Sequence, residues 1–246
     1  MWAILPLKDF VSAKTRLSGV LTQVERRRLF HAMVEDVLNA LQAAPSVSQI
    51  VIVSDDPSAV LLAEHYAAVL VDEPGGPALS EPLNRAIEAA LAIVPETEKV
   101  LVLHADLPEI CADDVEQIAV RALHSSSASV LLAADRIEIG TNALVFSAGV
   151  MPRFQFGANS LRRHCDMLDA EDVDWQLLDS PAFARDIDTP GDLLAFLHSD
   201  RAAVRHRARA PRMEPAAWRH IEWVRIGCAE MRIRYAKSGI GRQYGT

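Results

Sequence analysis

Residues 99–108, KVLVLHADLP, constrain the fold of this chain more than any other stretch. Five of the six residues from 100 to 105 are apolar. A short run that is apolar on both faces predicts a buried strand of a parallel sheet. The run stops at Asp106, and Pro108 cannot continue a strand ladder. We therefore expect Asp106 at the carboxyl end of a central strand, the edge at which open α/β sheets bind ligands.

An aspartate at this edge can hold a metal ion on a phosphate group. The alternative is that Asp106 only caps the helix that follows, but Asp113 and Asp114 are better placed for that role. The local pattern leaves both interpretations open, and we take Asp106 as a candidate metal ligand.

Strand and helix patterns alternate along the first 134 residues. Expected strands cover residues 2–7, 49–54, 68–71 and 129–134 besides the central one, and helical spacing lies between them. This alternation predicts a parallel, Rossmann-like sheet covered on both faces. In the second half the order changes, because residues 141–146 form a strand that is entered through a tight turn. The fold class we predict is therefore α/β with a Rossmann-like mixed sheet.

The loop after the first strand carries three cations, Lys8, Lys14 and Arg16. Such a loop can wrap a triphosphate, since lysine offers a compact charge and arginine a bidentate fork. A solvated basic loop is the alternative. The loop lacks the glycines of a Walker or dinucleotide motif, so side chains would hold the phosphates. Asp55 could reach a base or ribose, although a structural role is favoured, and Asn84 lies in the first turn of a helix over the sheet edge.

A late pair of carboxylates, Asp186 and Asp188, precedes the last helix of the body. If residues 183–188 form a strand, both carboxylates point to one face. Like charges about 4 Å apart repel by roughly 4 kcal/mol at an effective dielectric near 20, and a divalent cation reverses that sign. Together with Asp106 the pair predicts a Mg²⁺ site. Thr189, Pro190 and Asp192 predict a capped helix directly after it.

A second anion site is predicted where a glycine turn, residues 154–158, runs into a helix. Asn159 or Ser160 would cap this helix, and free backbone N–H groups at a helix start bind anions. Arg162 and Arg163 oppose the helix dipole there, which is easier to understand if an anion is bound. Two anionic substrates with Mg²⁺ between them suit phosphoryl transfer.

The charge of the chain is divided unevenly. Residues 201–246 hold 11 Lys and Arg against 3 Asp and Glu, whereas the chain of 246 residues has a net charge of −8. The acidic body argues against nucleic-acid binding. We expect no zinc site or disulfide framework from three scattered cysteines, no membrane span and no signal peptide, and hence a cytoplasmic protein. We expect the tail to begin as a linker. Docking of the tail on the acidic body, or disorder, is favoured over its contact with a polyanionic partner or its participation in a dimer.

Five stretches in order carry a family resemblance. They are Pro6–Lys8 with 13–17 (AKTRL), 105–108 (ADLP), 140–144 (GTNAL), 156–160 (FGANS) and 186–190 (DIDTP). Over residues 1 to about 197 the chain resembles the guanylyltransferases of deazaflavin coenzyme (F420) biosynthesis, the 2-phospho-L-lactate and phosphoenolpyruvate guanylyltransferase family. The order and spacing of all five together are specific, while each alone is weak.

The resemblance implies a nucleotidyltransferase fold related to glycosyltransferase-A domains in residues 1–200, with residues 201–246 as a basic extension. It implies GTP as donor and 2-phospholactate, phosphoenolpyruvate or 3-phosphoglycerate as acceptor. The implied site residues are, for the acceptor, Thr141, Gly157 and Ser160; for the metal, Asp106, Asp186 and Asp188; and for the triphosphate, Lys8, Lys14 and Arg16. We take Asp106, Lys14 and Arg16 as the catalytic candidates, and Asp55 and Asn84 as further nucleotide-binding candidates.

Two alternatives stay open at this point. A molybdopterin or sugar-phosphate nucleotidyltransferase has the same fold but usually a glycine-rich first loop, which this chain lacks. A nucleotide-binding protein without turnover is the other, and the three carboxylates speak against it. Pro82 stands where the family often has glycine, which affects the path near the nucleotide. The homodimer is a hypothesis only.

Overall fold

The computed structural model describes residues 1–7, 9–10, 13–74, 81–126, 129–151 and 153–199. The chain divides into two compact units. The first consists of residues 1–10 and 32–186, and the second of residues 11–31 and 187–246, so one of their three boundaries falls inside a helix. The predicted division at residue 200 stays a prediction, and the proposals for the tail lie outside the described residues.

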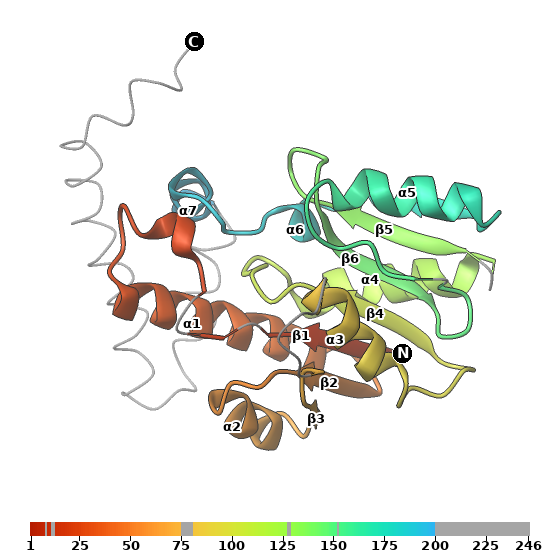
Figure 1. Ribbon diagram of the computed structural model, residues 1–246, viewed down its shortest axis with the longest axis horizontal. Helices are drawn as coiled ribbons and strands as arrows, with labels where there is room; N and C mark the ends of the chain where they lie inside the picture. Colours follow the sequence, from red (N-terminus) through yellow and green to blue (C-terminus); the bar gives the residue numbers. More distant parts are fainter. Residues whose placement is uncertain (8, 11–12, 75–80, 127–128, 152, 200–246) are drawn as a thin grey trace, which may run out of the picture. The chain divides into compact units, whose positions relative to one another are not determined.

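The first unit contains a seven-stranded sheet in the order β3-β2-β1-β4-β6-β5-β7 (Figure 1). The strands are β1 (Trp2–Pro6), β2 (Gln49–Val53), β3 (Val69–Val71), β4 (Lys99–Leu103), β5 (Val130–Ala134), β6 (Thr141–Ser147) and β7 (Trp175–Leu177). The predicted central strand is confirmed, because β4 lies between β1 and β6 and its residues 100–103 are all fully buried.

The sheet is mixed, as the predicted fold class states. The pairs β1–β2, β1–β4, β2–β3 and β5–β7 are parallel, whereas β6 runs antiparallel to both β4 and β5. The alternation in the first half had favoured a wholly parallel sheet, and β6 is the exception. The six residues between β5 and β6 are too few for a crossover connection, so the chain has to turn back on itself.

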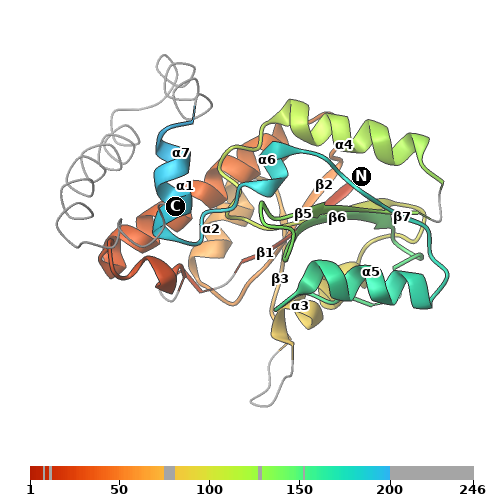
Figure 2. The ribbon, with the colours of Figure 1, turned by 90° about the horizontal axis from the view of Figure 1, so that it is seen from above.

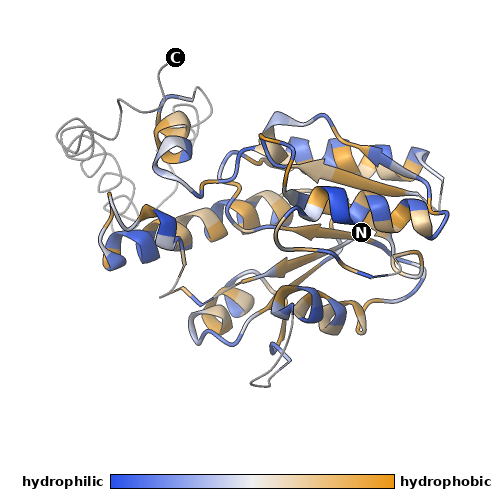
Figure 3. Cartoon of the chain, turned by 45° about the horizontal axis from the view of Figure 1, so that its top comes forward, coloured by the Kyte–Doolittle hydropathy of each residue, from blue (hydrophilic) through white to orange (hydrophobic). Residues whose placement is uncertain are grey.

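Helices cover both faces of this sheet. Those of the first unit are α2 (Ser58–His65), α3 (Pro82–Leu91), α4 (Ala112–His124), α5 (Ser160–Ala170), α6 (Pro181–Ala184) and residues 32–42 of α1 (Gln23–Gln42). Figure 2 shows α4 on one face and α3 and α5 on the other. The apolar residues of α3 and α5 pack on Ile4, Val102 and Phe146 in one buried cluster, and the strands stand out as hydrophobic in Figure 3.

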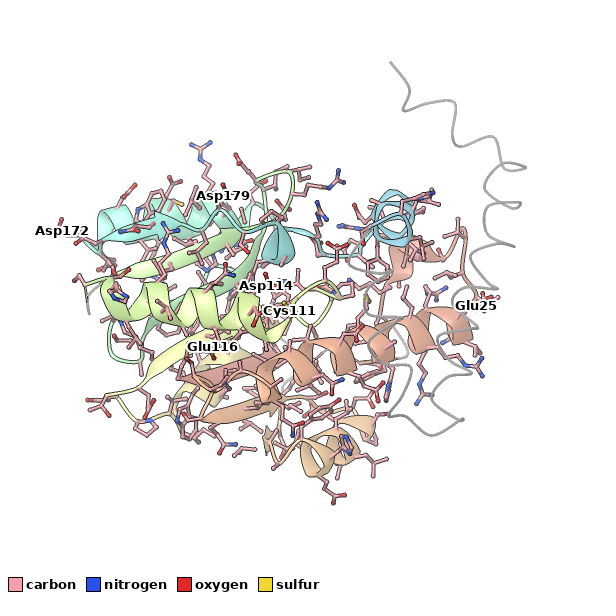
Figure 4. All side chains as sticks on the ribbon, turned by 180° about the vertical axis from the view of Figure 1, so that it is seen from behind. Glu25, Cys111, Asp114, Glu116, Asp172 and Asp179 are labelled. Atoms are coloured by element: carbon pink, nitrogen blue, oxygen red, sulfur yellow. The ribbon has the colours of Figure 1, made fainter. Side chains whose placement is uncertain are left out.

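The start of α4 is capped as predicted. The backbone N–H of Cys111 donates to the Asp114 carboxylate over 2.9 Å, and Figure 4 shows the two residues together at this end of the helix. The helix cap therefore does not need Asp106. Asp106 lies in a turn three residues beyond the last residue of β4.

The second unit contains η1 (Thr15–Leu17), the first residues of α1 and α7 (Pro190–Leu197). Thr22 and Glu25 form the predicted capping box of α1. Thr189 and Asp192 form the one before α7, with Pro190 at the first helical position. Both boxes are local, so sequence was sufficient to find them.

One local prediction is wrong. Residues 183–188 do not form a strand, because α6 occupies Pro181–Ala184 and the chain after it has no regular structure. Pro181 favours this helix, since its missing N–H is no loss at the first helical position.

Candidate active site

Two predicted metal ligands come together at the carboxyl end of the first unit's sheet. Asp106 follows β4 and Asp186 follows α6, and each offers a carboxylate oxygen within 4.8 Å of the other. The side chain of Asn142, at the start of β6, donates to Asp186 Oδ1 over 3.1 Å and to the carbonyl of Phe183 over 3.0 Å. Asn142 thus fixes one oxygen of Asp186. We call Asp106 and Asp186 the acidic edge.

An ion pair fastens the two segments that carry the acidic edge. Arg185, which precedes Asp186, contacts the carboxylate of Glu109 over 2.9 Å. Glu109 lies three residues after Asp106 and is 1% exposed. A buried carboxylate of this kind is stable only when it is paired, so the pair holds both acidic segments at a defined separation.

At the start of β6, where the strand has a bulge, neighbouring side chains point to different faces of the sheet, as they do along any strand. Ala133 pairs with Ala143, but Ala134 pairs with Thr141, so β6 has one extra residue at this point. Thr141 bonds to α5, whereas Asn142 bonds to α6 and Asp186. Figure 2 shows α5 and α6 on opposite sides of the sheet. Bulges commonly re-aim side chains next to active sites.

The second unit holds the predicted phosphate-binding cations next to the third acidic residue. Lys14 Nζ lies 2.7 Å from Asp188 Oδ1, and Arg16 lies 3.3 Å from Asp188 Oδ2. The Lys14 side chain is 5% exposed and that of Arg16 is 73% exposed. Lys14 has a left-handed backbone, φ 58°, directly before η1. The buried lysine is therefore the more firmly held of the two cations.

Asp188 is linked to Asp186 through a single residue, Ile187. Two successive peptide units span at most about 7 Å between Cα atoms, so the chain itself keeps Asp188 near the acidic edge. Asp106 and Asp186 form an acidic pair within the first unit that could bind a metal ion, and Asp188 stays the predicted third ligand. Three carboxylates are hard oxygen donors of the kind Mg²⁺ prefers, so the donor set fits this ion.

The three predicted acceptor residues lie in one region of the first unit. The backbone N–H of Thr141 donates to Ser160 Oγ over 2.8 Å. Thr141 is 1% exposed and Ser160 is 3% exposed, whereas Gly157 is exposed. Gly157 has φ 119°, a conformation that side chains rarely adopt. The residues open to a ligand are therefore those of the turn, and the buried hydroxyls lie beneath it. We call residues 154–160 the acceptor loop.

The start of α5 has no side-chain cap. Asn159 occupies the cap position with φ 55° but makes no capping hydrogen bond, and Ser160 Oγ accepts from Thr141 instead. A helix start of this kind presents backbone N–H groups to an anion. Arg162 and Arg163, which we associated with such an anion, have protein partners, Asp166 and Glu81 respectively. These pairs also offset the unfavourable helix dipole.

Asn84 clamps the acceptor loop from α3. Its Oδ1 accepts from the backbone N–H of Phe156 over 2.8 Å, and its Nδ2 donates to the carbonyl of the same residue over 3.4 Å. Asn84 is 3% exposed. Its nucleotide-binding role stays a prediction, and the contacts assign it a structural role besides. Pro82 stands at the first position of α3, where proline is well accommodated.

Glu81 connects the same helix start to α5. Its carboxylate pairs with Arg163 over 2.7 Å and accepts from Asn84 over 3.0 Å. The hydrogen bond from Arg163, followed by that from Asn84, lowers the pKa of Glu81. Arg163 also donates to the side chain of Gln155 over 2.8 Å. The loop is thus fastened from α3 and α5 together.

Two nucleotide candidates are placed less directly. Asp55 accepts the backbone N–H of Glu73 over 2.8 Å, which agrees with the structural role favoured for it. Asp56 accepts from the backbone N–H groups of Phe10 and Ser58. Lys8 lies outside the described residues. The binding roles of Asp55 and Lys8 stay predictions.

Sequence reasoning missed Asn142 and His164. Asn142 was visible as the neighbour of Thr141 in a matching stretch, but nothing in the sequence indicated a bulge. His164 follows Ser160 by four residues, which places both on one helix face. The eight histidines of the sequence show no metal-ligand spacing, so the sequence contains no signal for a site role of His164.

The fold is that of the nucleotidyltransferases among the solved structures. The solved CMP:2-keto-3-deoxy-manno-octonic acid synthetase shares the fold with a TM-score of 0.54, 12% identity and coverage of 83% of this chain and 98% of its own. The 4-diphosphocytidyl-2C-methyl-D-erythritol synthase of Anaerococcus prevotii has a TM-score of 0.54, 12% identity and coverage of 80% and 96%. This is the predicted nucleotidyltransferase fold related to glycosyltransferase-A domains.

The family model described as "Guanylyl transferase CofC like" matches residues 1–213, so the chain belongs to this family. It is a guanylyltransferase, as the resemblance predicted. The phosphoenolpyruvate guanylyltransferase of Roseiflexus sp. RS-1 is 37% identical over 193 residues, which are 78% of this chain and 82% of that protein. The enzyme of the same name from Conexibacter woesei is 32% identical over 197 residues, with coverage of 79% and 86%.

Among the described residues, we find no helix with the length and apolarity that a membrane crossing requires.

Proposed function

We propose that this chain transfers GMP from GTP to the phosphate of phosphoenolpyruvate in the biosynthesis of coenzyme F420. The relatives named above carry phosphoenolpyruvate in their names, and the chain covers 82–86% of their length. The observation that carries the proposal is the presence of an acidic edge and, apart from it, a helix start without a side-chain cap. Two anionic substrates need both features.

In the proposed reaction an oxygen of the acceptor phosphate forms a bond to the α-phosphorus of GTP. The bond from that phosphorus to the oxygen bridging to the β-phosphorus breaks, and pyrophosphate leaves with the electron pair. Asp106, Asp186 and Asp188 would hold Mg²⁺, which neutralises the charge that develops on the phosphate oxygens. Lys14 and Arg16 would contact the triphosphate.

The acceptor acid would bind at the acceptor loop, through the backbone around Gly157 and the start of α5. Phosphoenolpyruvate, 2-phospholactate and 3-phosphoglycerate all carry one phosphate and one carboxylate on three carbons. An uncapped helix start suits either anionic group. Phosphoenolpyruvate is the acceptor we propose, on the names of the relatives.

The test is pyrophosphate release from the purified chain with GTP and Mg²⁺, with each of the three acids added separately. We expect release with phosphoenolpyruvate, and loss of that release when the metal is chelated and its return when Mg²⁺ is restored. Release with 2-phospholactate or 3-phosphoglycerate alone would overturn the acceptor assignment but not the reaction. No release with any acid, from a folded protein, would overturn the reaction itself.

A further inference from the structure

One buried side chain, His164, contacts all the segments that carry the predicted acceptor residues. It lies on α5, is fully buried, and follows Ser160 by one helical turn. Its Nδ1 lies 3.1 Å from Thr141 Oγ1, at the start of β6. Its Nε2 accepts the backbone N–H of Gln155 over 2.9 Å, within the acceptor loop. A single ring therefore joins β6, α5 and the loop.

The partners of the ring determine its tautomer. A backbone N–H can only donate, so Nε2 must carry a lone pair to receive the bond from Gln155. A neutral imidazole then has its proton on Nδ1, and Thr141 Oγ1 accepts it. The threonine hydroxyl consequently keeps its own proton for donation. The direction of both hydrogen bonds of the ring therefore follows from one backbone amide.

The surroundings keep the ring neutral. Burial is the main reason that the pKa of His164 falls to about 4, and the charges of Arg163 and His104 lower it further. A second proton on the ring would also place an N–H group against the N–H of Gln155. Arg163 is itself paired with Glu81, the residue directly before α3. The network therefore keeps the same protonation state throughout the neutral pH range.

Packing reinforces the hydrogen bonds. The ring of Phe156 meets His164 edge to face with centroids 4.9 Å apart. Asn84 holds the backbone of Phe156 at both its N–H and its carbonyl. Gly157 follows directly with its positive φ. The exposed turn thus lies next to a buried, neutral imidazole whose orientation is fixed by its hydrogen bonds.

We propose that His164 is the positioning residue of the acceptor site, whose Nδ1–H tautomer holds Thr141 and the acceptor loop in the arrangement that receives the phosphorylated acid. This inference rests on the proposed function for the identity of the acid. His164 does not contact the reacting atoms, and its role is carried out through the loop. Such preorganisation affects binding of the acceptor more than binding of GTP.

The first test compares His164→Phe with His164→Asn. Phenylalanine keeps the contact with Phe156 and removes both hydrogen bonds, whereas asparagine can replace the Nδ1–H donor to Thr141. We expect His164→Phe to raise the KM for phosphoenolpyruvate at least tenfold and to change the KM for GTP less than twofold, and His164→Asn to recover part of the loss. His124→Asn, at an exposed histidine at the end of α4, is the control.

Equal changes in both KM values, or none, would overturn the role of His164 in an active enzyme. An inactive wild type would contradict the proposed function instead, so the two failures are distinguishable. Nitrogen-15 NMR of histidine-labelled wild type tests the tautomer without any variant. A protonated Nδ1 and a bare Nε2 at pH 7 are the expected result, and a proton on Nε2 would overturn the proposal even if the His164 variants fail to fold.

Discussion

The acidic edge and the acceptor loop are organised by opposite physical means. The acidic edge brings two like charges together within 4.8 Å and orients one of them through Asn142. The acceptor loop rests on neutral groups whose donors and acceptors are matched, with His164 at their centre. The first arrangement gains stability when a cation arrives, whereas the second is complete beforehand. The proposed metal site would therefore gain stability on binding its ion, whereas the proposed acid site is already ordered before its ligand binds.

The sharpest way to test this difference is Asp106→Asn. Removal of one charge weakens the proposed metal site, and metal stabilisation of transferring phosphate is worth several kcal/mol. We expect pyrophosphate release to fall at least about 10³-fold, while thermal stability stays equal or rises because a repulsion is removed.

Asp172→Asn is the matched control, since Asp172 is an exposed aspartate with φ 57° between α5 and β7 (Figure 4). Asparagine tolerates this backbone, so activity should be unchanged. An Asp106→Asn variant with full activity would show that Asp106 holds no metal.

For the acceptor loop we predict a change in folding stability at acidic pH. The folded-state pKa of His164 is about 4 against 6.5 for an ordinary histidine. As the pH falls from 6.5 to 4 the unfolded chain binds a proton that the folded chain does not, so stability is lost in that window. The loss amounts to about 3 kcal/mol for this group.

Urea unfolding of wild type and His164→Phe, measured from pH 7 to pH 4, checks this prediction. The difference between the two free energies of unfolding isolates His164 from the carboxylates that titrate in the same range. A difference that does not vary with pH would mean that His164 is not held neutral by the fold.

Asn142→Ala tests how far the acidic edge depends on its single oriented oxygen. Outer partners of metal ligands commonly contribute 10- to 100-fold to affinity or activity. We expect turnover to fall by about that factor and the Mg²⁺ requirement to rise, while the KM for the acceptor acid changes little. A titration of activity with Mg²⁺ measures both effects. An unchanged Mg²⁺ dependence would argue that Asp186 is oriented by other groups.

The smallest effect is expected in the second unit, where Lys14 and Arg16 share Asp188. Lys14→Met removes a buried cation at 2.7 Å, and Arg16→Met an exposed one at 3.3 Å. Exposed ion pairs contribute about 0–1 kcal/mol. We expect the KM for GTP to rise about tenfold for Lys14→Met and by less than about fivefold for Arg16→Met. The reverse order would mean that exposure, not burial, marks the triphosphate contact.

Local signals in the sequence predicted the parts of the fold that depend on neighbours in the chain. The central strand followed from an apolar run, and the cap of α7 from Thr189 and Asp192. The wrong strand at 183–188 shows the limit of such signals. Six residues with two alternating aspartates fit a strand pattern, but Pro181 and the docking of Phe183 in the core determine a short helix instead.

The charged residues of the candidate site were predictable from the sequence, but the residues that orient them were not. Asp106 was predicted because a carboxylate directly after a buried strand is unusual, and Asp186 because it forms a pair of carboxylates with Asp188. Asn142 and His164 were not found, because an amide or a buried imidazole acquires its role only from partners far away in sequence. The antiparallel direction of β6 belongs to the same class of tertiary information.

The bulge in β6 has a consequence for how such a site can change over generations. Thr141 and Asn142 serve opposite faces because successive residues of a strand point to opposite sides of the sheet, and the bulge gives β6 one residue more than β5 at this point. Loss of a single codon here would shift that alternation, so the bond from Thr141 to α5 and the bonds from Asn142 to α6 and Asp186 would be disturbed together. Selection therefore acts on both regions at once at this strand end.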